Sequence, residues 1–427
     1  MTVTSSPAST DALLGLFPIG TALGDAGMLL LGGCDAGELA AAFGTPALII
    51  DEAALRSRAR MYVDGLAARW PNSLVVWASK SLPHTGIYRL LAEEGLGADV
   101  SGGGEIVMAL AGGVEPGRMV LHGNAKTDEE LAMAARAGVG TIVIDGFDDI
   151  DRLERLFEKT QSEQGVLVRV IPGVLPDTHA AVVTGHTSSK FGLAPAAAKQ
   201  AIARLRGSDH LRLDGLHVHI GSQVMDAEPF TAAVEAIAKL GEFAVYNLGG
   251  GLGAKYTYRD HPISVETYLD TLTAAARQLL PSTARLMIEP GRSLVAEAGV
   301  TLYRVVTVKR GEITFVAVDG GMSDNLEVSL YGQRFEATIA DRVGGGEMCT
   351  VVGRHCESGD QLIDRVELRD PCVGDLLAVP VTGAYCLTMA NNYNGARRPP
   401  IVFARDGAPR LVLRRETFDD FTRRDLD

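Results

Sequence analysis

The chain has 427 residues, of which 46% are hydrophobic, so it is long enough to bury a large core and to form more than one domain. Its formal net charge of −13 disfavours nucleic acid and anionic membranes as partners, because an acidic exterior repels their phosphate groups. These properties favour an enzyme that acts on small molecules.

The N-terminal region offers no export or membrane signal. Residues 1–12 are polar and lack the basic start of a secretory signal, so we expect a frayed tail. The apolar stretch 13–33 contains Pro18, Asp25 and several glycines, which favour short buried segments over a membrane helix. The five cysteines are odd in number and include no CxxC pair, which argues against a disulfide framework or a zinc cluster. We therefore expect a cytoplasmic protein and no metal site.

Between residues 73 and 292, short β-branched runs alternate with amphipathic helical stretches, a pattern typical of parallel βα units. The pattern predicts eight strands and hence a closed (β/α)8 barrel, whose functional side chains lie at the C-terminal ends of the strands. The predicted strands are 73–80, 97–102, 119–123, 141–146, 165–173, 213–222, 244–251 and 286–292.

A further strand at 47–52 is expected as a lead-in element to the barrel. After about residue 296 the pattern changes to alternating strands, including a hairpin centred on the Arg310-Gly311 pair. We therefore predict a barrel domain over 46–295 and a β-rich domain, sandwich-like or barrel-like, formed by 1–45 and 296–427. The interface between such domains is a favoured place for a ligand.

Lys80 ends the first predicted barrel strand beside Val76, Trp77 and Ala78. Apolar neighbours would partly desolvate the amine, lower its pKa and leave it available to form a Schiff base. Taken alone, a lysine at this position is more often solvated or ion-paired.

Three other strand ends carry chemistry that complements a reactive lysine. The glycines of NLGGGLG (247–253) suit a phosphate group, EPGR (289–292) supplies a carboxylate and a guanidinium, and HVHIGSQ (217–223) supplies an imidazole and a hydroxyl. Each has a plainer interpretation: a glycine turn, a surface ion pair or a buried core histidine. Together with Lys80 they describe a pocket for pyridoxal 5′-phosphate (PLP), with Glu289 keeping the pyridine nitrogen protonated.

The chain resembles the fold-type III PLP-dependent decarboxylases, in the branch that contains the diaminopimelate, ornithine and arginine decarboxylases. The resemblance rests on motifs that occur in family order along nearly the whole chain: VVWASK (75–80), HGNAKTDEEL (122–131), VIPGV with SSKFGL, GLHVHIGSQ (215–223), NLGGGLG, EPGRSLVAEAG (289–299), CESGD (356–360) and GAYCLTMANNYNGARRP (383–399). It implies a barrel with a β-domain, and a homodimer whose active sites lie at the subunit interface.

The resemblance also implies roles for individual residues. Lys80 would be the Schiff-base lysine, His219 the residue stacked on the ring and Glu289 the partner of its nitrogen. Cys356 would donate a proton, from the other subunit, to the carbon that loses CO2, as suits a thiol, and Glu357 would bind the distal amino group of the substrate. Further cofactor contacts would come from Ser222, Gly249, Gly250, Gly251, Gly291, Arg292 and Tyr385, of which Arg292 and Tyr385 also lie near the substrate.

Two departures from the family pattern concern substrate specificity. Diaminopimelate decarboxylases typically read R-P-x-L-Y where this chain reads EVSLY, so Glu327 replaces the arginine while Tyr331 is retained. In a desolvated pocket this exchange would repel a distal carboxylate by on the order of several kcal/mol. Alternatively, Glu327 turns outward or pairs with Arg354 or Arg334. Arg354 itself replaces the usual proline before the cysteine.

We therefore expect a PLP-dependent decarboxylase of an amino acid whose distal end is amino-bearing, basic or conjugated. The alternative is meso-diaminopimelate decarboxylase, which makes L-lysine. From another class, an amino-acid racemase shares the barrel and the lysine, but the CESGD and GAY segments disfavour it. A non-catalytic homologue is disfavoured because Lys80, Glu289 and Cys356 are all present.

Overall fold

The computed structural model describes residues 10–174 and 189–426, so most of the predicted N-terminal tail lies outside the described residues. The chain divides into two compact units. The barrel unit comprises Arg58–Gly253 and Pro262–Leu294. The sheet unit comprises Met1–Ser57, Ala254–His261 and Val295–Asp427.

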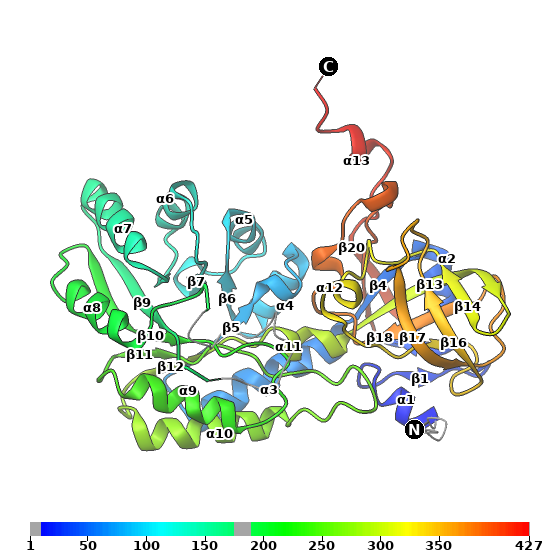
Figure 1. Cartoon of the computed structure of the whole chain (residues 1–427), viewed down its shortest axis with the longest axis horizontal. Helices are drawn as coiled ribbons and strands as arrows, with labels where there is room; N and C mark the ends of the chain where they lie inside the picture. The colour runs from blue at the N-terminus through cyan, green and yellow to red at the C-terminus, as the bar shows by residue number, and fades with distance from the viewer. Residues whose placement is uncertain (1–9, 175–188, 427) are drawn as a thin grey trace. The chain divides into compact units, whose positions relative to one another are not determined.

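Eight parallel strands form a closed barrel, which confirms the predicted fold class (Figure 1). Each strand pairs with its neighbours in chain order, and the last strand pairs with the first to close the ring. The strands are β5 (Ser73–Ala78), β6 (Gly97–Val100), β7 (Met119–Leu121), β8 (Thr141–Ile144), β9 (Gln164–Val170), β10 (Leu211–Val218), β11 (Val245–Asn247) and β12 (Arg285–Ile288).

Every predicted barrel strand is present, but each ends a few residues before the end predicted from the sequence. Lys80 lies in the 3-10 turn η1 (Ser79–Ser81) after β5, and Glu289 follows β12 directly. His219 follows β10 in the same way. The candidate functional residues therefore belong to the loops at the C-terminal face of the barrel, where such enzymes carry their chemistry.

Helices follow the barrel strands and surround the barrel (Figure 1). Their starts are encoded locally: the helix after β7 begins with a capping box in which Thr127 and Glu130 each accept a hydrogen bond from the other's backbone N–H. The helices of this unit are α4 (Thr85–Glu93), α5 (Gly103–Ala111), α6 (Asp128–Ala137), α7 (Phe147–Thr160), α8 (Pro195–Leu205), α9 (Glu228–Ala238) and α10 (Val265–Leu279), while α3 (Glu52–Arg69) and α11 (Arg292–Val295) cross its boundary.

Large aliphatic side chains from five strands fill one cluster of the barrel core. They alternate along their strands with residues that face the helices, as the period of two in a strand requires. The cluster consists of Leu74, Val76, Val120, Val143, Leu167 and Met287. This packed layer gives the loops above it a rigid base.

The sheet unit contains a nine-stranded sheet whose main path runs β17-β16-β14-β13-β4-β19-β20, with β18 pairing β13 and β15. The predicted hairpin at Arg310-Gly311 is present, because β13 and β14 pair antiparallel on either side of it. The strands are β4 (Ala47–Asp51), β13 (Gly299–Lys309), β14 (Thr314–Val318), β15 (Thr338–Ile339), β16 (Glu347–Val352), β17 (Gln361–Leu368), β18 (Leu376–Pro380), β19 (Ile401–Arg405) and β20 (Ala408–Leu413).

The strand expected as a lead-in to the barrel does not join it. This strand, β4, pairs antiparallel with β13 and parallel with β19, in the middle of the nine-stranded sheet. The pairing of β12 with β5 closes the barrel and leaves no free edge for another strand. All five residues of β4 are buried, as expected for a central strand.

The remaining elements of the sheet unit are short. The apolar stretch 13–33 forms brief segments with buried side chains such as Leu13, Phe17 and Leu31, as predicted. Among the described residues, no helix has the length and apolar character needed to cross a membrane. The elements are α1 (Thr10–Leu14), β1 (Ala22–Leu23), β2 (Leu29–Leu31), β3 (Cys34–Asp35), α2 (Ala36–Phe43), α12 (Glu327–Tyr331) and α13 (Asp419–Thr422), with 3-10 turns at Ala296–Ala298, Leu387–Met389 and Tyr393–Gly395.

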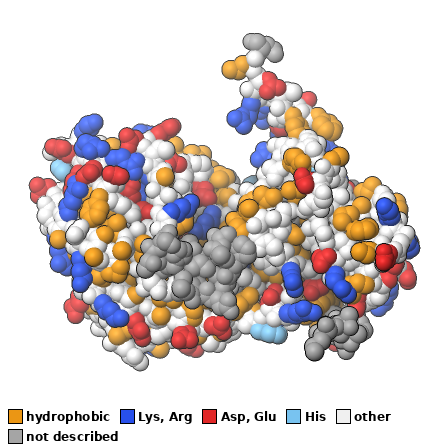
Figure 2. All heavy atoms as spheres, viewed as in Figure 1, with side chains coloured by type: hydrophobic (Ala, Val, Ile, Leu, Met, Phe, Trp, Pro, Cys, Tyr) orange, Lys and Arg blue, Asp and Glu red, His pale blue; other side chains and the backbone are white. Residues whose placement is uncertain are grey.

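The charged side chains on the visible face are mixed in sign (Figure 2). In the barrel unit, ion pairs join opposite charges, for example Arg204 with Glu154 and Arg60 with Glu94. A surface of this kind differs from the continuous basic stripe that tracks a nucleic-acid backbone.

Candidate active site

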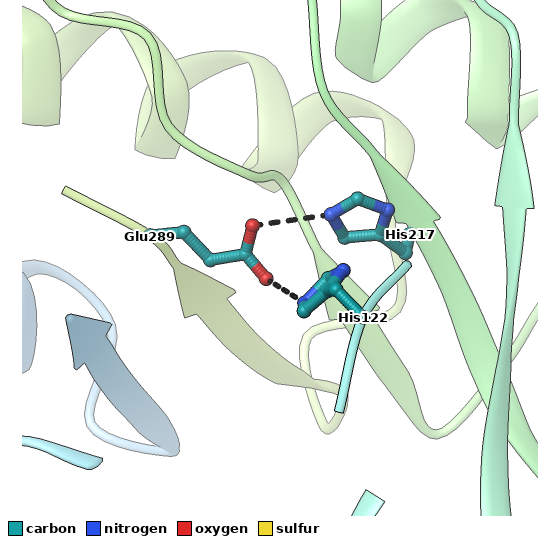
Figure 3. A group of neighbouring side chains, drawn as sticks. All are labelled: His122, His217 and Glu289. Atoms are coloured by element: carbon teal, nitrogen blue, oxygen red, sulfur yellow. Dashed lines mark hydrogen bonds and ion pairs between the residues drawn. The ribbon is translucent and has the colours of Figure 1, made fainter. Parts of the chain in front are cut away.

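Glu289 is the centre of a buried hydrogen-bonded cluster at the C-terminal face of the barrel (Figure 3). Its Oε1 atom lies 2.8 Å from His122 Nε2 and accepts a hydrogen bond of 2.6 Å from Asn247 Nδ2. Its Oε2 atom lies 3.2 Å from His217 Nε2. The two imidazoles meet edge to face, with ring centroids 4.6 Å apart. A residue after β7 and residues within β10 and β11 thus converge on the carboxylate that follows β12.

The charges in this cluster follow from its burial and its carboxylates. Burial raises the pKa of Glu289, but His122 and His217 lower it by more, so the pKa is well below its usual range. Burial lowers the pKa of His122, but Asp99 and Glu289 outweigh that effect and raise it overall. Burial lowers the pKa of His217 to about 4. These shifts favour an ionised Glu289 beside a protonated His122 and a neutral His217.

His219 is fixed by the glycine turn that follows β11. Its Nδ1 atom accepts a hydrogen bond of 3.2 Å from Gly250 N–H, which orients the ring. Burial, together with the nearby charges of Lys80 and Arg169, lowers the pKa of His219 well below its ordinary value. A neutral, oriented imidazole is suited to stacking on a flat ring.

The glycine turn is tightly packed and already uses part of its hydrogen-bonding capacity. A Cβ atom on Gly249, at φ +67°, would lie 2.2 Å from Val218 O, and one on Gly250 would lie 2.0 Å from Glu289 O, so only glycine fits. Gly249 N–H donates to Asn247 Oδ1 at 3.0 Å, and Gly250 N–H to His219 Nδ1. Of the three amides predicted to hold phosphate, only that of Gly251 donates to no acceptor in the part of the chain that the structure describes.

Ser222 and Arg292 lie together next to this turn, because Arg292 Nε donates to Ser222 Oγ at 3.2 Å. Arg292 is buried and Ser222 half-buried. Gly291 directly precedes Arg292, and its Cα faces the Cβ atom of Ala78 at the end of β5. A hydroxyl, a guanidinium and an amide in one place suit a phosphate group.

Lys80 differs from our expectation in one respect. Its side chain is exposed rather than partly desolvated, because η1 extends beyond the apolar part of β5, where Val76 and Trp77 are buried. The turn around it is nevertheless fixed: Ser79 Oγ donates to Asp99 O at 2.7 Å, and Trp77 Nε1 donates to Ser81 Oγ at 3.0 Å. The lysine therefore stands on a fixed turn with its side chain exposed.

Three buried polar atoms around this face have no hydrogen-bond partner among the described residues, and they test whether the site fits a polar cofactor. Asp99 Oδ1, Asp145 Oδ1 and His217 Nδ1 are buried and form no hydrogen bond with any described residue. Such atoms are uncommon in native interiors and normally meet water or a ligand. An amine, a stacking ring, an ionised acid and phosphate ligands on one barrel face fit PLP.

The sheet unit carries the other predicted site residues. Cys356 and Glu357 are exposed on the loop between β16 and β17. The next acid of that loop, Asp360, is buried and braces it: Oδ2 accepts from His355 N–H and Oδ1 from Met322 N–H, each at 2.7 Å. Cys356 N–H donates to Asn394 Oδ1 at 3.2 Å. The loop thus presents a thiol and a carboxylate from a fixed backbone.

Three further predicted residues belong to the same unit. Glu327 is 1% exposed at the start of α12, so it does not turn outward, and Tyr331 ends that helix half-buried. Tyr385 is half-buried and has a left-handed backbone, φ +63°, which is uncommon for a tyrosine and is typical of residues held for a function.

The sequence motifs contained functional residues to which we assigned no role. His122 stands in HGNAKTDEEL, His217 in GLHVHIGSQ and Asn247 in NLGGGLG. The signal that could have identified them is their position: each lies at or next to the C-terminal end of a barrel strand, where polar side chains converge.

The comparisons with known proteins agree with this geometry. The sequence model of the family described as "Pyridoxal-dependent decarboxylase, pyridoxal binding domain" matches residues 53–296, more than half of the chain. A diaminopimelate decarboxylase of Actinosynnema pretiosum subsp. auranticum is 47% identical, covering 96% of this chain and 95% of the relative. That of Bacillus subtilis is 41% identical, covering 94% and 95%.

A solved structure has the same fold. Diaminopimelate decarboxylase from M. jannaschii, in complex with L-lysine, superposes with a TM-score of 0.90 at 30% sequence identity, covering 96% of this chain and 98% of that one. From the barrel, the site at its C-terminal face and these relatives, the chain belongs to the PLP-dependent decarboxylases of the diaminopimelate decarboxylase-like family.

Proposed function

We propose that the protein decarboxylates meso-diaminopimelate to L-lysine. The observation that carries this proposal is the 47% identity to a diaminopimelate decarboxylase along 96% of the chain. The comparisons support this substrate better than the one with an altered distal end that we expected from Glu327.

The barrel unit would hold the cofactor. Lys80 would attach it covalently, His219 would stack on its ring and Glu289 would pair with its nitrogen. Its phosphate group would be bound by Gly251 N–H with Ser222 and Arg292. Gly249, Gly250 and Gly291, which lack side chains, would let the backbone approach the cofactor closely. When bound, PLP accepts the electron pair that the departing carboxylate leaves behind.

The sheet unit would complete the reaction. The Cys356 thiol donates a proton to the carbon that has lost CO2, and Glu357 binds the distal amino group of the substrate. Tyr385 and Tyr331 line the substrate. We further propose that Cys356 and Glu357 serve the barrel of a second copy in a homodimer, as the family resemblance implies.

We also propose that the protein acts in the cytoplasm. None of the five cysteines forms a disulfide, and Cys356 and Cys372 are exposed. A reducing compartment keeps exposed thiols in the form that proton donation requires.

A second candidate keeps the reaction and changes the substrate. Glu327 is buried at the position where an arginine is typical of diaminopimelate decarboxylases. A buried carboxylate favours an amino-bearing or basic distal group over a carboxylate.

The two candidates are separated by offering the purified, PLP-loaded enzyme meso-diaminopimelate, lysine, ornithine and arginine and following CO2 release. We expect turnover of meso-diaminopimelate alone, with L-lysine as product. Turnover of a basic amino acid without turnover of meso-diaminopimelate would establish the second candidate instead. A racemase would invert the substrate and release no CO2, which chiral analysis of the products detects.

A further inference from the structure

Glu289 is held by three nitrogen atoms from three different segments of the barrel. His122 and Asn247 contact one oxygen, and His217 contacts the other (Figure 3). Asn247 and His217 form hydrogen bonds with Glu289, and His122 Nε2 lies at ion-pair distance, so a carboxylate with about four acceptor sites keeps room for a further donor. The cluster therefore fixes the carboxylate in one orientation and leaves it able to receive one N–H group from a ligand.

His122 lies between two carboxylates. Its Nε2 atom is 2.8 Å from Glu289 Oε1 and 3.7 Å from Asp99 Oδ1. The opposing influences are burial and the cation of Arg169 on β9, while His217 on β10 faces it with an uncharged ring. Because a buried carboxylate is stabilised in its ionised form by a nearby cation, a charge on His122, in contact with Glu289, favours the ionised state of Glu289.

We propose that His122 is a positioning residue that acts through Glu289: it orients the buried carboxylate and supplies the positive charge that keeps it ionised. In this arrangement His217 is a neutral brace for the second oxygen. The proposal rests on the proposed role of Glu289 as partner of the cofactor nitrogen and does not depend on which amino acid is the substrate.

The two histidines permit a matched comparison. Glutamine can place a donor near the position of Nε2 but carries no charge, so His122→Gln removes the charge and His217→Gln removes none. We expect the PLP affinity of His122→Gln to fall about tenfold as the pH decreases from 8 to 6, since Glu289 then becomes protonated. Wild-type protein and His217→Gln should show no such dependence. Affinity is measured by reconstituting the apoprotein with PLP and recording the absorbance spectrum.

A double-variant cycle tests whether His122 acts through Glu289. In a Glu289→Gln background no carboxylate remains to be kept ionised, so adding His122→Gln should leave PLP affinity nearly unchanged at every pH. A pH-independent affinity in His122→Gln alone, or an effect that persists undiminished in the double variant, would overturn the proposal.

The same experiment separates this proposal from the one on which it rests. If Glu289→Gln leaves the affinity and spectrum of the cofactor unchanged, the role of Glu289 is wrong. If Glu289→Gln alters them and His122→Gln does not, only the inference about His122 fails.

A measurement on proteins with His122 intact covers the case in which the His122 variants do not fold. In 15N-histidine-labelled wild-type protein, one imidazole should stay doubly protonated beyond pH 7, and in Glu289→Gln it should lose its proton at a lower pH. If no imidazole behaves in this way, the proposal is overturned.

Discussion

Asp360 Oδ2 accepts a hydrogen bond of 2.7 Å from the backbone N–H of His355, the residue that precedes Cys356. Its other oxygen accepts one of equal length from Met322 N–H, and Gly353 N–H donates to Asp360 O. One buried carboxylate thus ties both ends of the loop that carries Cys356 and Glu357 to the segment after β14. The acid is structural, although in the sequence it looks as exposed and as functional as Glu357.

Replacing Asp360 should loosen this loop without disturbing the cofactor. In Asp360→Ala, the two N–H groups lose their acceptor, at a cost of about 1–3 kcal/mol each, and Cys356 loses its fixed position. We expect kcat to fall by about 10²-fold while PLP attachment is unchanged. Steady-state kinetics and the cofactor spectrum check both points. Glu357→Gln is the matched control, and we expect it to raise KM. Equal kinetics for wild type and Asp360→Ala would contradict the role of Asp360 in holding the loop.

Lys80→Ala should abolish covalent attachment of PLP. Borohydride reduction followed by intact-mass measurement should add the cofactor to wild-type protein but not to the variant. The surface variant Lys199→Ala is the control for the loss of a lysine, and it should gain the mass of the reduced cofactor as fully as the wild-type protein does. A Lys80→Ala protein that still gains the mass of the reduced cofactor would refute the assignment.

Sharing of active sites between subunits can be tested by mixing two inactive variants. Lys80→Ala lacks the cofactor lysine, and Cys356→Ala should retain PLP but protonate its product slowly. If Cys356 serves the partner's barrel, random reassociation should restore about a quarter of wild-type activity, because half of the dimers then contain one intact site. Activity that stays at the level of the separate variants after subunit exchange would show that each chain builds its own site.

The barrel could be predicted from the sequence because each of its strands is identified by a short local pattern. Each strand is a β-branched run that ends in polar or glycine residues, so both the strand and the chemistry at its end could be predicted. The cluster around Glu289 could not be predicted from the sequence, because His122 and His217 meet only through the register of a closed barrel. The same holds for β4, whose partners β13 and β19 follow about 250 and 350 residues later. The exposure of Lys80 depends on where β5 stops, which the sequence leaves uncertain by a few residues.

Asp324 should make the stability of the sheet unit depend on pH. Burial raises its pKa from 3.8 to about 7, partly offset by hydrogen bonds from Tyr303 and Gly321. Because the folded-state pKa exceeds the unfolded one, the stabilising contribution is complete below about pH 4 and is lost as the pH rises to about 7. Each pKa unit corresponds to about 1.4 kcal/mol, which is an upper bound for such a buried group.

Asp324→Asn should therefore flatten the change in apparent melting temperature between pH 5 and pH 8. Burial also raises the pKa of Glu336 to about 7, so this residue should preserve part of the decrease in melting temperature with pH. Glu336→Gln is the matched comparison. If the wild-type melting temperature rises across this interval, the assignment has the wrong sign.

Glu327 should decide between the two substrate candidates. If it lies at the distal end of the substrate, Glu327→Arg should raise kcat/KM for meso-diaminopimelate by about tenfold or more and lower it for basic amino acids. Glu327→Gln, which keeps the size and removes the charge, should give a smaller shift in the same direction. Unchanged selectivity in two well-folded variants would show that this residue does not contact the substrate.

The position of β4 has a consequence for how this protein can be divided. The segment that matches the PLP-binding family, 53–296, begins just after β4, while the strands on either side of β4 come from residues 299–309 and 401–405. A protein that starts after residue 52 would leave β13 and β19 facing a gap where a fully buried strand belongs, and one that stops near residue 296 would leave β4 with neither neighbour. The sheet around β4 is therefore complete only when segments about 350 residues apart are both present, so β4 gains its second neighbour only after residues 401–405 have been synthesised.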